Sequence, residues 1–187
     1  MMRQDPDIIL VGEIRDQETA EMAFRAAMTG HQVYSTLHTN SSIGAIPRLM
    51  DLGVLPDIMA GNIIGVIAQR LMRKLCTYCR APYEPDPATR SLLGMAEHDD
   101  RPVYRPVGCG KCDKQGYKGR LAIMEIFKLD AEIDELIARR ATGREIRTAA
   151  SAKGFRTLAD DAIGRVLMGQ TSLEEISRVV DLTDRVI

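Results

Sequence analysis

The sequence lacks several features that would point to particular classes of protein. It has no Trp, and aromatic residues make up only 4% of its 187 residues, so a core must be mostly aliphatic. A formal net charge of −1 gives no overall positive field, and we therefore expect no nucleic-acid partner. The longest apolar region, residues 58–68, is interrupted by Asn62 and is too short to span a bilayer.

Two further absences concern the chain's location and its chemistry. Residues 1–7 contain no apolar stretch behind a basic leader, so we expect no signal peptide and a cytoplasmic protein. No segment has the form GxxxxGK followed by Ser or Thr, the loop that cradles the phosphates of a nucleotide. Without those backbone donors and that Lys, we expect this chain alone not to hydrolyse a nucleotide at a meaningful rate.

The four cysteines of the chain form two matched pairs, Cys76-Thr-Tyr-Cys79 and Cys109-Gly-Lys-Cys112. Two such pairs separated by a long connecting segment predict a closed tetrathiolate zinc site. The zinc would be structural, because four thiolates leave no open position for water. Two other interpretations stay open: an iron ion in the same thiolates, and a thioredoxin-type redox pair.

A cluster of cations flanks the first cysteine pair: Arg70, Arg73, Lys74 and Arg80. These side chains could offset the negative charge of a metal–thiolate centre. The alternative is a surface that faces phosphate or lipid headgroups. The sequence leaves both interpretations open.

The first forty residues predict an α/β fold. Residues 8–11 are a continuous apolar run, typical of a strand buried on both faces in a parallel sheet. Asp16 is a candidate N-cap for a helix that runs to Thr29, and Gly30 would end it. Residues 32–37 predict a second strand, which completes a strand–helix–strand unit.

The remainder of the sequence is predicted to be mainly helical. Gly residues separate the C-terminal helices, and Thr142 and the pair Thr171-Ser172 are candidate N-caps. The prolines of residues 82–105 predict a surface excursion between the cysteine pairs. The predicted helices cover residues 43–52, 57–75, 131–141, 143–153, 158–168 and 172–180, and a further strand covers residues 121–127.

Acidic and histidine side chains follow the two predicted strands. Glu13 comes directly after the first strand, where a carboxylate can orient a water or help to hold a hydrated magnesium ion. His31 precedes the second strand and His38 follows it, so His38 would lie near Glu13 if the strands are adjacent. A surface carboxylate and a structural histidine are the alternatives.

Several blocks of the sequence, in order, resemble the secretion-superfamily ATPases, which power type II secretion and type IV pilus assembly. Residues 5–16 resemble the Walker B region of that family, and residues 30–39 resemble its histidine box. Residues 69–76, leading into the cysteine pairs, resemble its tetracysteine zinc module, and residues 116–125 and 154–158 match later segments. The resemblance covers essentially the whole chain.

The resemblance implies roles for individual residues. Glu13 would be the water-activating carboxylate, and His31 and His38 the residues of the histidine box, with His38 nearer the phosphate. Arg15 and Asp16 would shape the same nucleotide-binding edge. The four cysteines would bind structural zinc, whereas ATP and Mg²⁺ would be cofactors of the full-length enzyme.

The resemblance also implies an architecture and partners. It predicts the C-terminal part of a RecA-like P-loop ATPase core in residues 1–75, a zinc module in residues 76–120, and a C-terminal strand and helical bundle in residues 121–187. The full-length protein would be a homo-hexamer at the cytoplasmic face of the inner membrane, where it would meet a membrane-platform protein. Secretion, pilus assembly and DNA uptake are not distinguished. The alternatives are a zinc-stabilised protein-interaction module without nucleotide chemistry and a nucleic-acid-binding zinc ribbon, which the near-neutral charge disfavours.

Overall fold

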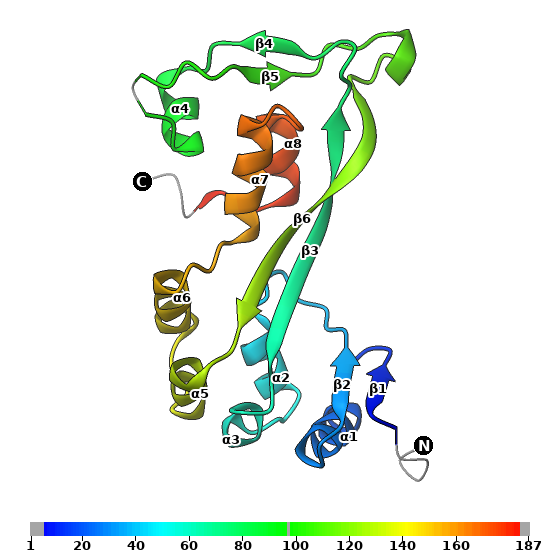
Figure 1. Cartoon of the computed structure of the whole chain (residues 1–187), viewed down its shortest axis with the longest axis vertical. Coiled ribbons are helices and arrows are strands. Elements are labelled where there is room, and N and C mark those ends of the chain that lie inside the picture. The colour runs from blue at the N-terminus through cyan, green and yellow to red at the C-terminus, as the bar shows by residue number, and fades with distance from the viewer. Residues whose placement is uncertain (1–5, 97, 184–187) are drawn as a thin grey trace. The chain divides into compact units, whose positions relative to one another are not determined.

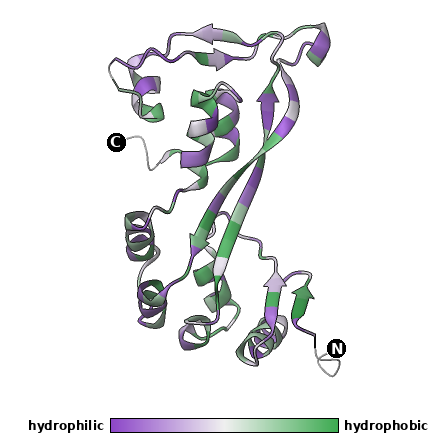
Figure 2. Cartoon of the chain, viewed as in Figure 1, coloured by the Kyte–Doolittle hydropathy of each residue, from purple (hydrophilic) through white to green (hydrophobic). Residues whose placement is uncertain are grey.

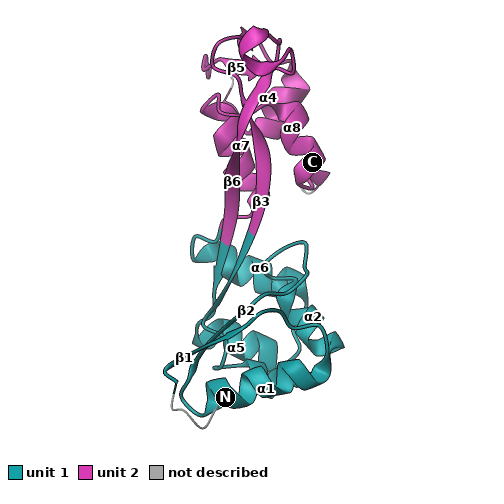
Figure 3. Cartoon of the chain, turned by 90° about the vertical axis from the view of Figure 1, so that its right-hand side faces the viewer, with its two compact units in different colours: residues 1–68, 126–155 teal, residues 69–125, 156–187 magenta. Residues whose placement is uncertain are grey.

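The protein divides into two compact units (Figure 3). The structure, a computed structural model, describes residues 6–96 and 98–183. Unit 1 comprises residues 1–68 and 126–155, and unit 2 comprises residues 69–125 and 156–187. Strands β3 (Gly65–Leu75) and β6 (Tyr117–Lys128) pair with each other, and the division between the units falls within both strands. The predicted division by role, at residues 75 and 120, stays a prediction.

Unit 1 begins with the expected strand–helix–strand arrangement (Figure 1). Strand β1 (Ile8–Val11) and strand β2 (Gln32–Ser35) are parallel, and helix α1 (Gln17–Met28) connects them. The Asp16 carboxylate accepts a hydrogen bond of 2.8 Å from the backbone N–H of Thr19, which makes it the N-cap of α1. The predicted α/β arrangement and the predicted cap are confirmed.

The prediction that β1 is buried on both faces is wrong. Ile8 and Leu10 are 60% and 78% exposed, although β1 is strongly apolar (Figure 2). Within the described residues β1 and β2 form a sheet of two strands, and α1 packs against β2. Val11 and Val33 face the core of unit 1, so only one face of this sheet is covered.

The core of unit 1 gathers apolar side chains from several short helices. These helices are α2 (Ala45–Asp51), α3 (Pro56–Met59), α5 (Ala131–Ala138) and α6 (Gly143–Ala152). Helix α3 packs on α5, and α5 packs on α6. The core residues are mostly aliphatic, as the composition predicts: Ile14, Ala20, Ala23, Phe24, Ile43, Ile46, Leu49, Val54, Met59, Phe127, Ile133, Leu136, Ile137, Ile146 and Ala150.

The helix predicted over residues 57–75 is wrong. Helix α3 ends at Met59, and β3 begins at Gly65. The sequence misleads because the buried residues Ala68 and Met72 are four apart, a spacing that suits both a helix and one face of a strand. Pairing with β6 decides the outcome, because it gives backbone groups of β3 their hydrogen-bond partners.

Unit 2 contains the segment between the cysteine pairs and the last two helices. Its further elements are β4 (Ala81–Tyr83), α4 (Pro87–Leu93), β5 (Val103–Arg105), a 3-10 turn (Gly110–Cys112), α7 (Leu158–Leu167) and α8 (Leu173–Val179). The predicted surface excursion is in fact a small folded piece, since β4 pairs with β5 and Leu93 and Val103 are buried. In the described part of the chain, no helix has the length and apolar character needed to cross a membrane.

The C-terminal secondary structure agrees with the sequence. The predicted strand lies within β6, and the predicted helices correspond to α5, α6, α7 and α8. Thr142 caps α6 in a reciprocal capping box with Glu145, and Ser172 caps α8 through the backbone N–H of Glu175. These local signals predict the helix boundaries because cap and helix lie within a few residues of each other.

Candidate functional site

The structure brings Glu13, Arg15 and His38 together at the carboxyl edge of the β1–β2 sheet. His38 Nε2 lies 3.1 Å from Glu13 Oε2, and Arg15 Nε lies 2.6 Å from the same oxygen. Among the described residues, both contacts of the Glu13 carboxylate therefore go to Oε2. The side chains of Arg15 and His38 are 70% and 79% exposed, whereas that of Glu13 is 35% exposed.

Two hydrogen bonds continue beyond the ends of β1 and β2 and hold this edge. Ile14 N–H donates to the Thr36 carbonyl at 3.0 Å, and the Thr36 hydroxyl donates to the Gly12 carbonyl at 2.8 Å. Because Gly12 and Ile14 flank Glu13, and Thr36 lies two residues before His38, these bonds hold the two loops of the edge next to each other. The buried Ile14 side chain anchors the same loop in the core.

Charge and hydrogen bonding keep Glu13 ionised. The hydrogen bond from Arg15 is the largest effect and lowers the pKa of Glu13 below its ordinary value of 4.5. Desolvation opposes it as the second effect, and the hydrogen bond with His38, which is smaller again, lowers the pKa further. Glu13 is therefore a carboxylate at neutral pH. Such a group can accept a hydrogen bond from a water or neutralise part of a cation's charge.

Two of the residues predicted for this edge, His31 and Asp16, bond to the backbone of α1. His31 lies just before β2, at the end of that strand opposite to His38, and its Nδ1 is 3.0 Å from the Ala26 carbonyl. Asp16 caps α1, and its hydrogen bond to Thr19 lowers its pKa. The structure does not bring His31 to Glu13, so a chemical role for His31 stays a prediction.

The four cysteine sulfurs converge in unit 2. The sulfur atoms of Cys76, Cys79, Cys109 and Cys112 all lie within 4.8 Å of one another, and none forms a disulfide. Three of the separations are 3.7, 3.9 and 4.0 Å. A tetrahedral site with metal–sulfur bonds of about 2.3 Å places its sulfurs about 3.8 Å apart, so the cluster fits one zinc ion.

Backbone N–H groups point at the sulfurs, as expected where thiolates carry charge. Gly108 N–H donates to Cys79 Sγ, and Gly116 N–H donates to Cys112 Sγ, each at 3.3 Å. Gly108 has a φ of +107°, and a Cβ there would lie 2.5 Å from the Lys114 carbonyl oxygen. Only glycine therefore allows this donor to reach the sulfur.

The thiols differ in how readily they ionise. Desolvation raises the pKa of Cys79 to about 11. Desolvation also opposes ionisation of Cys112, but hydrogen bonds from the N–H groups of Cys109 and Gly116, and from the neighbouring thiols, together outweigh it and lower the pKa of Cys112 to about 7. A bound dication favours the thiolate form of every ligand, so these values apply to the metal-free cluster.

Two of the four cations that flank the first cysteine pair point into unit 2. The Arg73 guanidinium lies 4.1 Å from the centre of the Tyr117 ring and bonds to Glu175. The Arg80 guanidinium stacks on Tyr104 at 4.5 Å and donates to the Gly169 carbonyl. These contacts favour a structural role for the two arginines over a surface for anions.

The residues that position the two sites are not all evident from the sequence. The donors Gly108 and Gly116 leave a signal, a glycine one residue before Cys109 and another four residues after Cys112. Glu175 leaves none, because its partner Arg73 lies in a distant strand. Thr36 joins the two strand ends through its own hydroxyl, which only the paired strands reveal.

Comparison with known sequences gives a consistent family. The model of the family "Type II/IV secretion system protein" matches residues 1–178. The chain is 45% identical over 179 residues to "Type II secretion system protein E" of Pseudomonas aeruginosa, covering 96% of this chain and 36% of that protein. It is 46% identical over 177 residues to "Type IV pilus assembly ATPase PilB" of Thermus thermophilus, covering 94% of this chain and 20% of that protein.

Solved structures show the same fold. The ATPase DotB of Yersinia pseudotuberculosis matches with a TM-score of 0.67 at 19% identity, covering 97% of this chain and 39% of that one. The ATPase DotB of Legionella pneumophila matches with a TM-score of 0.61 at 22% identity, covering 95% and 39%. The chain thus spans about a third or less of the length of the curated relatives described above.

Proposed function

Because this chain belongs to the family of type II/IV secretion system proteins, we propose that it is the C-terminal segment of an ATPase that powers type II secretion or type IV pilus assembly. Part of a RecA-like core would lie in unit 1, and a zinc module in unit 2. The complete enzyme would bind ATP and Mg²⁺, assemble as a homo-hexamer and act at the cytoplasmic face of the inner membrane with a platform protein.

Glu13 would be the carboxylate that orients the attacking water. The observation that carries this proposal is the 3.1 Å contact between Glu13 and His38 at the carboxyl edge of a parallel sheet, where folds of this kind bind ligands. Arg15 and His38 both engage Oε2, which leaves Oε1 for a water or a hydrated magnesium ion. A lowered pKa makes Glu13 a weak base, so positioning the water would matter more than removing its proton.

His38 would complete the edge by sensing the terminal phosphate. Its side chain is 79% exposed and already holds Glu13 through Nε2, so an approaching phosphate would compete with the carboxylate for the same imidazole. Arg15, on the other side of Oε2, would keep Glu13 ionised when His38 moves away. Asp16 and His31 would support this edge through the ends of α1.

Zinc would be a structural ion of unit 2. The cluster of Cys76, Cys79, Cys109 and Cys112 can hold one dication with all four positions filled by sulfur. When bound, the ion supplies cross-linking of two chain segments and no reaction chemistry. The backbone donors Gly108 and Gly116 would share the negative charge that the four thiolates leave on the centre.

A hybrid enzyme tests the proposed role of Glu13. This chain would replace the matched 179 residues of the Pseudomonas aeruginosa relative, and the hybrid would be assayed for Mg²⁺-dependent ATP hydrolysis. We expect turnover, and we expect Glu13→Gln to reduce it by about a hundredfold or more, the usual effect of losing a group that positions the attacking nucleophile.

The matched control is Glu18→Gln, which makes the same change at an exposed position in the first turn of α1. It should leave turnover within about twofold, as surface substitutions usually do. A hybrid that turns over equally fast with Glu13→Gln would refute the catalytic assignment. The 187-residue chain alone should show no steady hydrolysis, because its sequence has no phosphate loop.

A second candidate is a zinc-stabilised interaction module that performs no nucleotide chemistry. The sequence observation that favours it is the missing phosphate loop, without which unit 1 offers few donors to a triphosphate. A hybrid that assembles and binds its partners but never hydrolyses ATP would favour this candidate.

A further inference from the structure

Consecutive residues of the α7–α8 turn, residues 169–172, bond to residues that flank the four cysteines. Gly169 O accepts from Arg80, which follows Cys79, and Gln170 O accepts from the backbone N–H of Leu75, which precedes Cys76. The hydroxyl of Thr171 donates to Arg73 O at 2.8 Å, and the hydroxyl of Ser172 lies 2.7 Å from that of Tyr117. Thr171 and Ser172 are almost fully buried, so these bonds are shielded from water.

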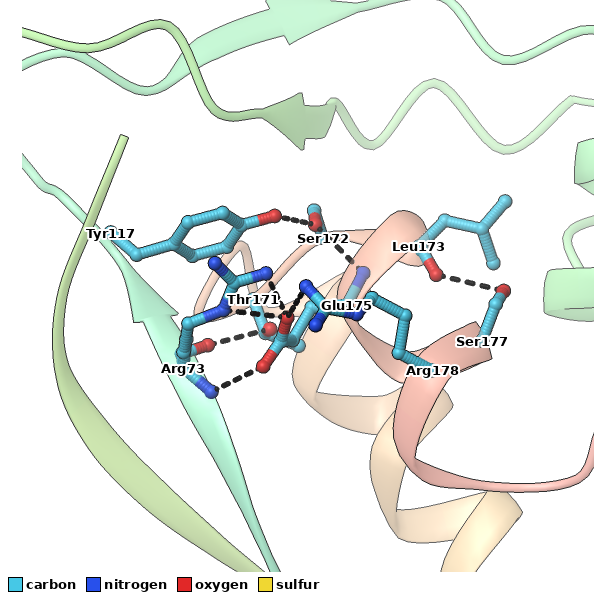
Figure 4. A network of polar contacts seen from close by, with 8 residues as sticks. All are labelled: Arg73, Tyr117, Thr171, Ser172, Leu173, Glu175, Ser177 and Arg178. Carbon is cyan, nitrogen blue, oxygen red and sulfur yellow. Dashed lines mark hydrogen bonds and ion pairs between the residues drawn. The ribbon is translucent and has the colours of Figure 1, made fainter. Parts of the chain in front are cut away.

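Glu175 extends this attachment into the first turn of α8 (Figure 4). Its carboxylate accepts from the backbone N–H of Arg73 at 2.9 Å and from Arg73 Nε at 2.8 Å. The guanidinium lies over the Tyr117 ring, and the Glu175 side chain is only 6% exposed. A buried carboxylate held by one strand residue fixes the position of α8 closely, because each of its bonds is directional and protected.

Gly116 joins this network to the sulfurs. Its N–H donates to Cys112 Sγ at 3.3 Å, and its carbonyl accepts from Cys76 N–H at 2.9 Å. It therefore bridges the two cysteine pairs, and the next residue is Tyr117. A Cβ at Gly116 would lie 2.5 Å from Pro106 Cβ, so the chain passes here with no room to shift.

We infer that docking of the α7–α8 turn and of α8 is energetically coupled to metal binding by the four cysteines. This inference rests on the proposed zinc site and goes beyond it, because it assigns Tyr117, Arg73 and Glu175 as positioning residues of a centre that they do not ligate. The route runs from Cys112 through Gly116 to Tyr117, and from there to Ser172 at the N-cap of α8. A second route runs from Cys76 back along β3 to Arg73 and Glu175.

Thermodynamic linkage makes the inference testable in both directions. If zinc stabilises the docked turn, then the docked turn must stabilise bound zinc by the same factor. Removing a contact of the turn therefore weakens zinc binding, although the altered residue never touches the ion. A helix that is merely packed nearby would show no such effect.

The test is a zinc competition titration of the whole chain against a chromophoric chelator. Tyr117→Phe removes the hydroxyl that meets Ser172, and Glu175→Gln removes the charge that holds Arg73. We expect each variant to weaken zinc binding by about fivefold or more, the lower end of the range for coupled sites.

The matched controls are Tyr78→Phe, which alters an exposed tyrosine inside the first cysteine pair, and Glu174→Gln, which alters an exposed neighbour of Glu175. Both should stay within about twofold of the unaltered chain.

Hydrogen exchange of the unaltered chain gives a second measurement that does not depend on variants folding. Stripping zinc should remove protection from α8 and residues 169–172, while the amides of α6 in unit 1 keep theirs. The coupling would be refuted if both variants bound zinc as tightly as the unaltered chain, or if α8 kept its protection after zinc was stripped. Either result would leave the proposed zinc site itself unaffected. A chain that binds no zinc would overturn both.

Discussion

The two candidate sites differ in how far they are enclosed by the protein. The edge around Glu13 consists of two exposed side chains and a half-buried carboxylate that follow two strands, and its described contacts converge on one carboxylate oxygen. The cysteine cluster is enclosed, with Cys76 and Cys112 buried, backbone N–H groups directed at its sulfurs and a helix turn bonded to its flanks. Both sites sit where segments distant in sequence meet.

This difference indicates which site is complete within the chain. A tetrathiolate cluster needs only its four sulfurs and one ion, all of which unit 2 can provide or bind. A nucleotide site needs donors to its phosphates as well as a carboxylate, and no segment of the sequence has the form GxxxxGK followed by Ser or Thr. We therefore expect perturbations of unit 2 to be large and measurable in the isolated chain, and those of the Glu13 edge to be small until the rest of an enzyme is supplied.

Metal removal should give the largest effect. Zinc modules of this size bind their ion with an apparent free energy of about 10–16 kcal/mol, most of which is folding free energy. A strong chelator should therefore unfold the cysteine region of unit 2, seen as lost circular dichroism and lost amide protection in residues 69–125.

Cys109→Ser is the genetic counterpart and should behave like the chelated chain without any chelator. Amides of α1 and α5 serve as the internal control, because unit 1 holds its own core. An unchanged melting curve after complete zinc removal would contradict the proposed structural role of zinc. The cysteine cluster would then contribute no more to stability than the Glu13 edge does.

Breaking the Arg73–Glu175 pair should come next. Arg73→Ala leaves the Glu175 carboxylate buried without its main partner, and breaking a fully buried pair costs about 3–5 kcal/mol. The Arg73 side chain is 37% exposed, so solvent screening lowers our expectation to about 2–3 kcal/mol in urea unfolding at saturating zinc. The exposed Arg25, which pairs with Glu21 on α1, gives the matched control Arg25→Ala, expected within about 1 kcal/mol. Equal losses in the two variants would contradict a special role for the buried pair.

The two helix caps give a smaller and closely matched comparison. Thr142→Ala in unit 1 removes an N-cap, which usually costs about 1 kcal/mol. Ser172→Ala in unit 2 removes an N-cap and also leaves the buried Tyr117 hydroxyl without that partner, so we expect about 2 kcal/mol. Urea unfolding measures both, and zinc affinity should fall only for Ser172→Ala. Weakened zinc binding in Thr142→Ala would show that the effect is general loss of stability.

Local signals in the sequence predict much of this fold. Asp16 and Thr142 cap the helices that they were expected to cap, and of the expected pair Thr171-Ser172 it is Ser172 that caps α8, because a cap and its helix lie in one short segment. The cysteine cluster could be predicted for a related reason, since two CxxC pairs in one chain have the spacing of a metal site. The approach of His38 to Glu13 followed from the parallel pairing of two strands.

The errors arose where partners are distant in sequence. Residues 65–75 form a strand because β6 pairs with them, and no pattern within the segment distinguishes that outcome from a helix. The exposure of Ile8 and Leu10 depends on what lies beside β1, which the apolar run itself does not specify. The network around Glu175 was missed for the same reason, because Arg73 is 102 residues away.

Substitutions at the Glu13 edge should have the smallest effect in the isolated chain, and this effect is measured as a change in the pKa of Glu13. In the isolated chain, carboxyl NMR should give a pKa for Glu13 below its ordinary value of 4.5. Arg15→Gln should move that pKa back toward the ordinary value by more than His38→Gln does, because the hydrogen bond from Arg15 is the largest cause of the shift.

A folded-state pKa of Glu13 below its unfolded-state pKa stabilises the protein above pH 4.5, and this contribution is lost as pH falls through the folded pKa. Because the group is so open to solvent, Glu13→Gln should leave the melting temperature at pH 7 within about 2 °C. A larger loss would mean that Glu13 holds unit 1 together, which would remove the main reason to assign it to chemistry.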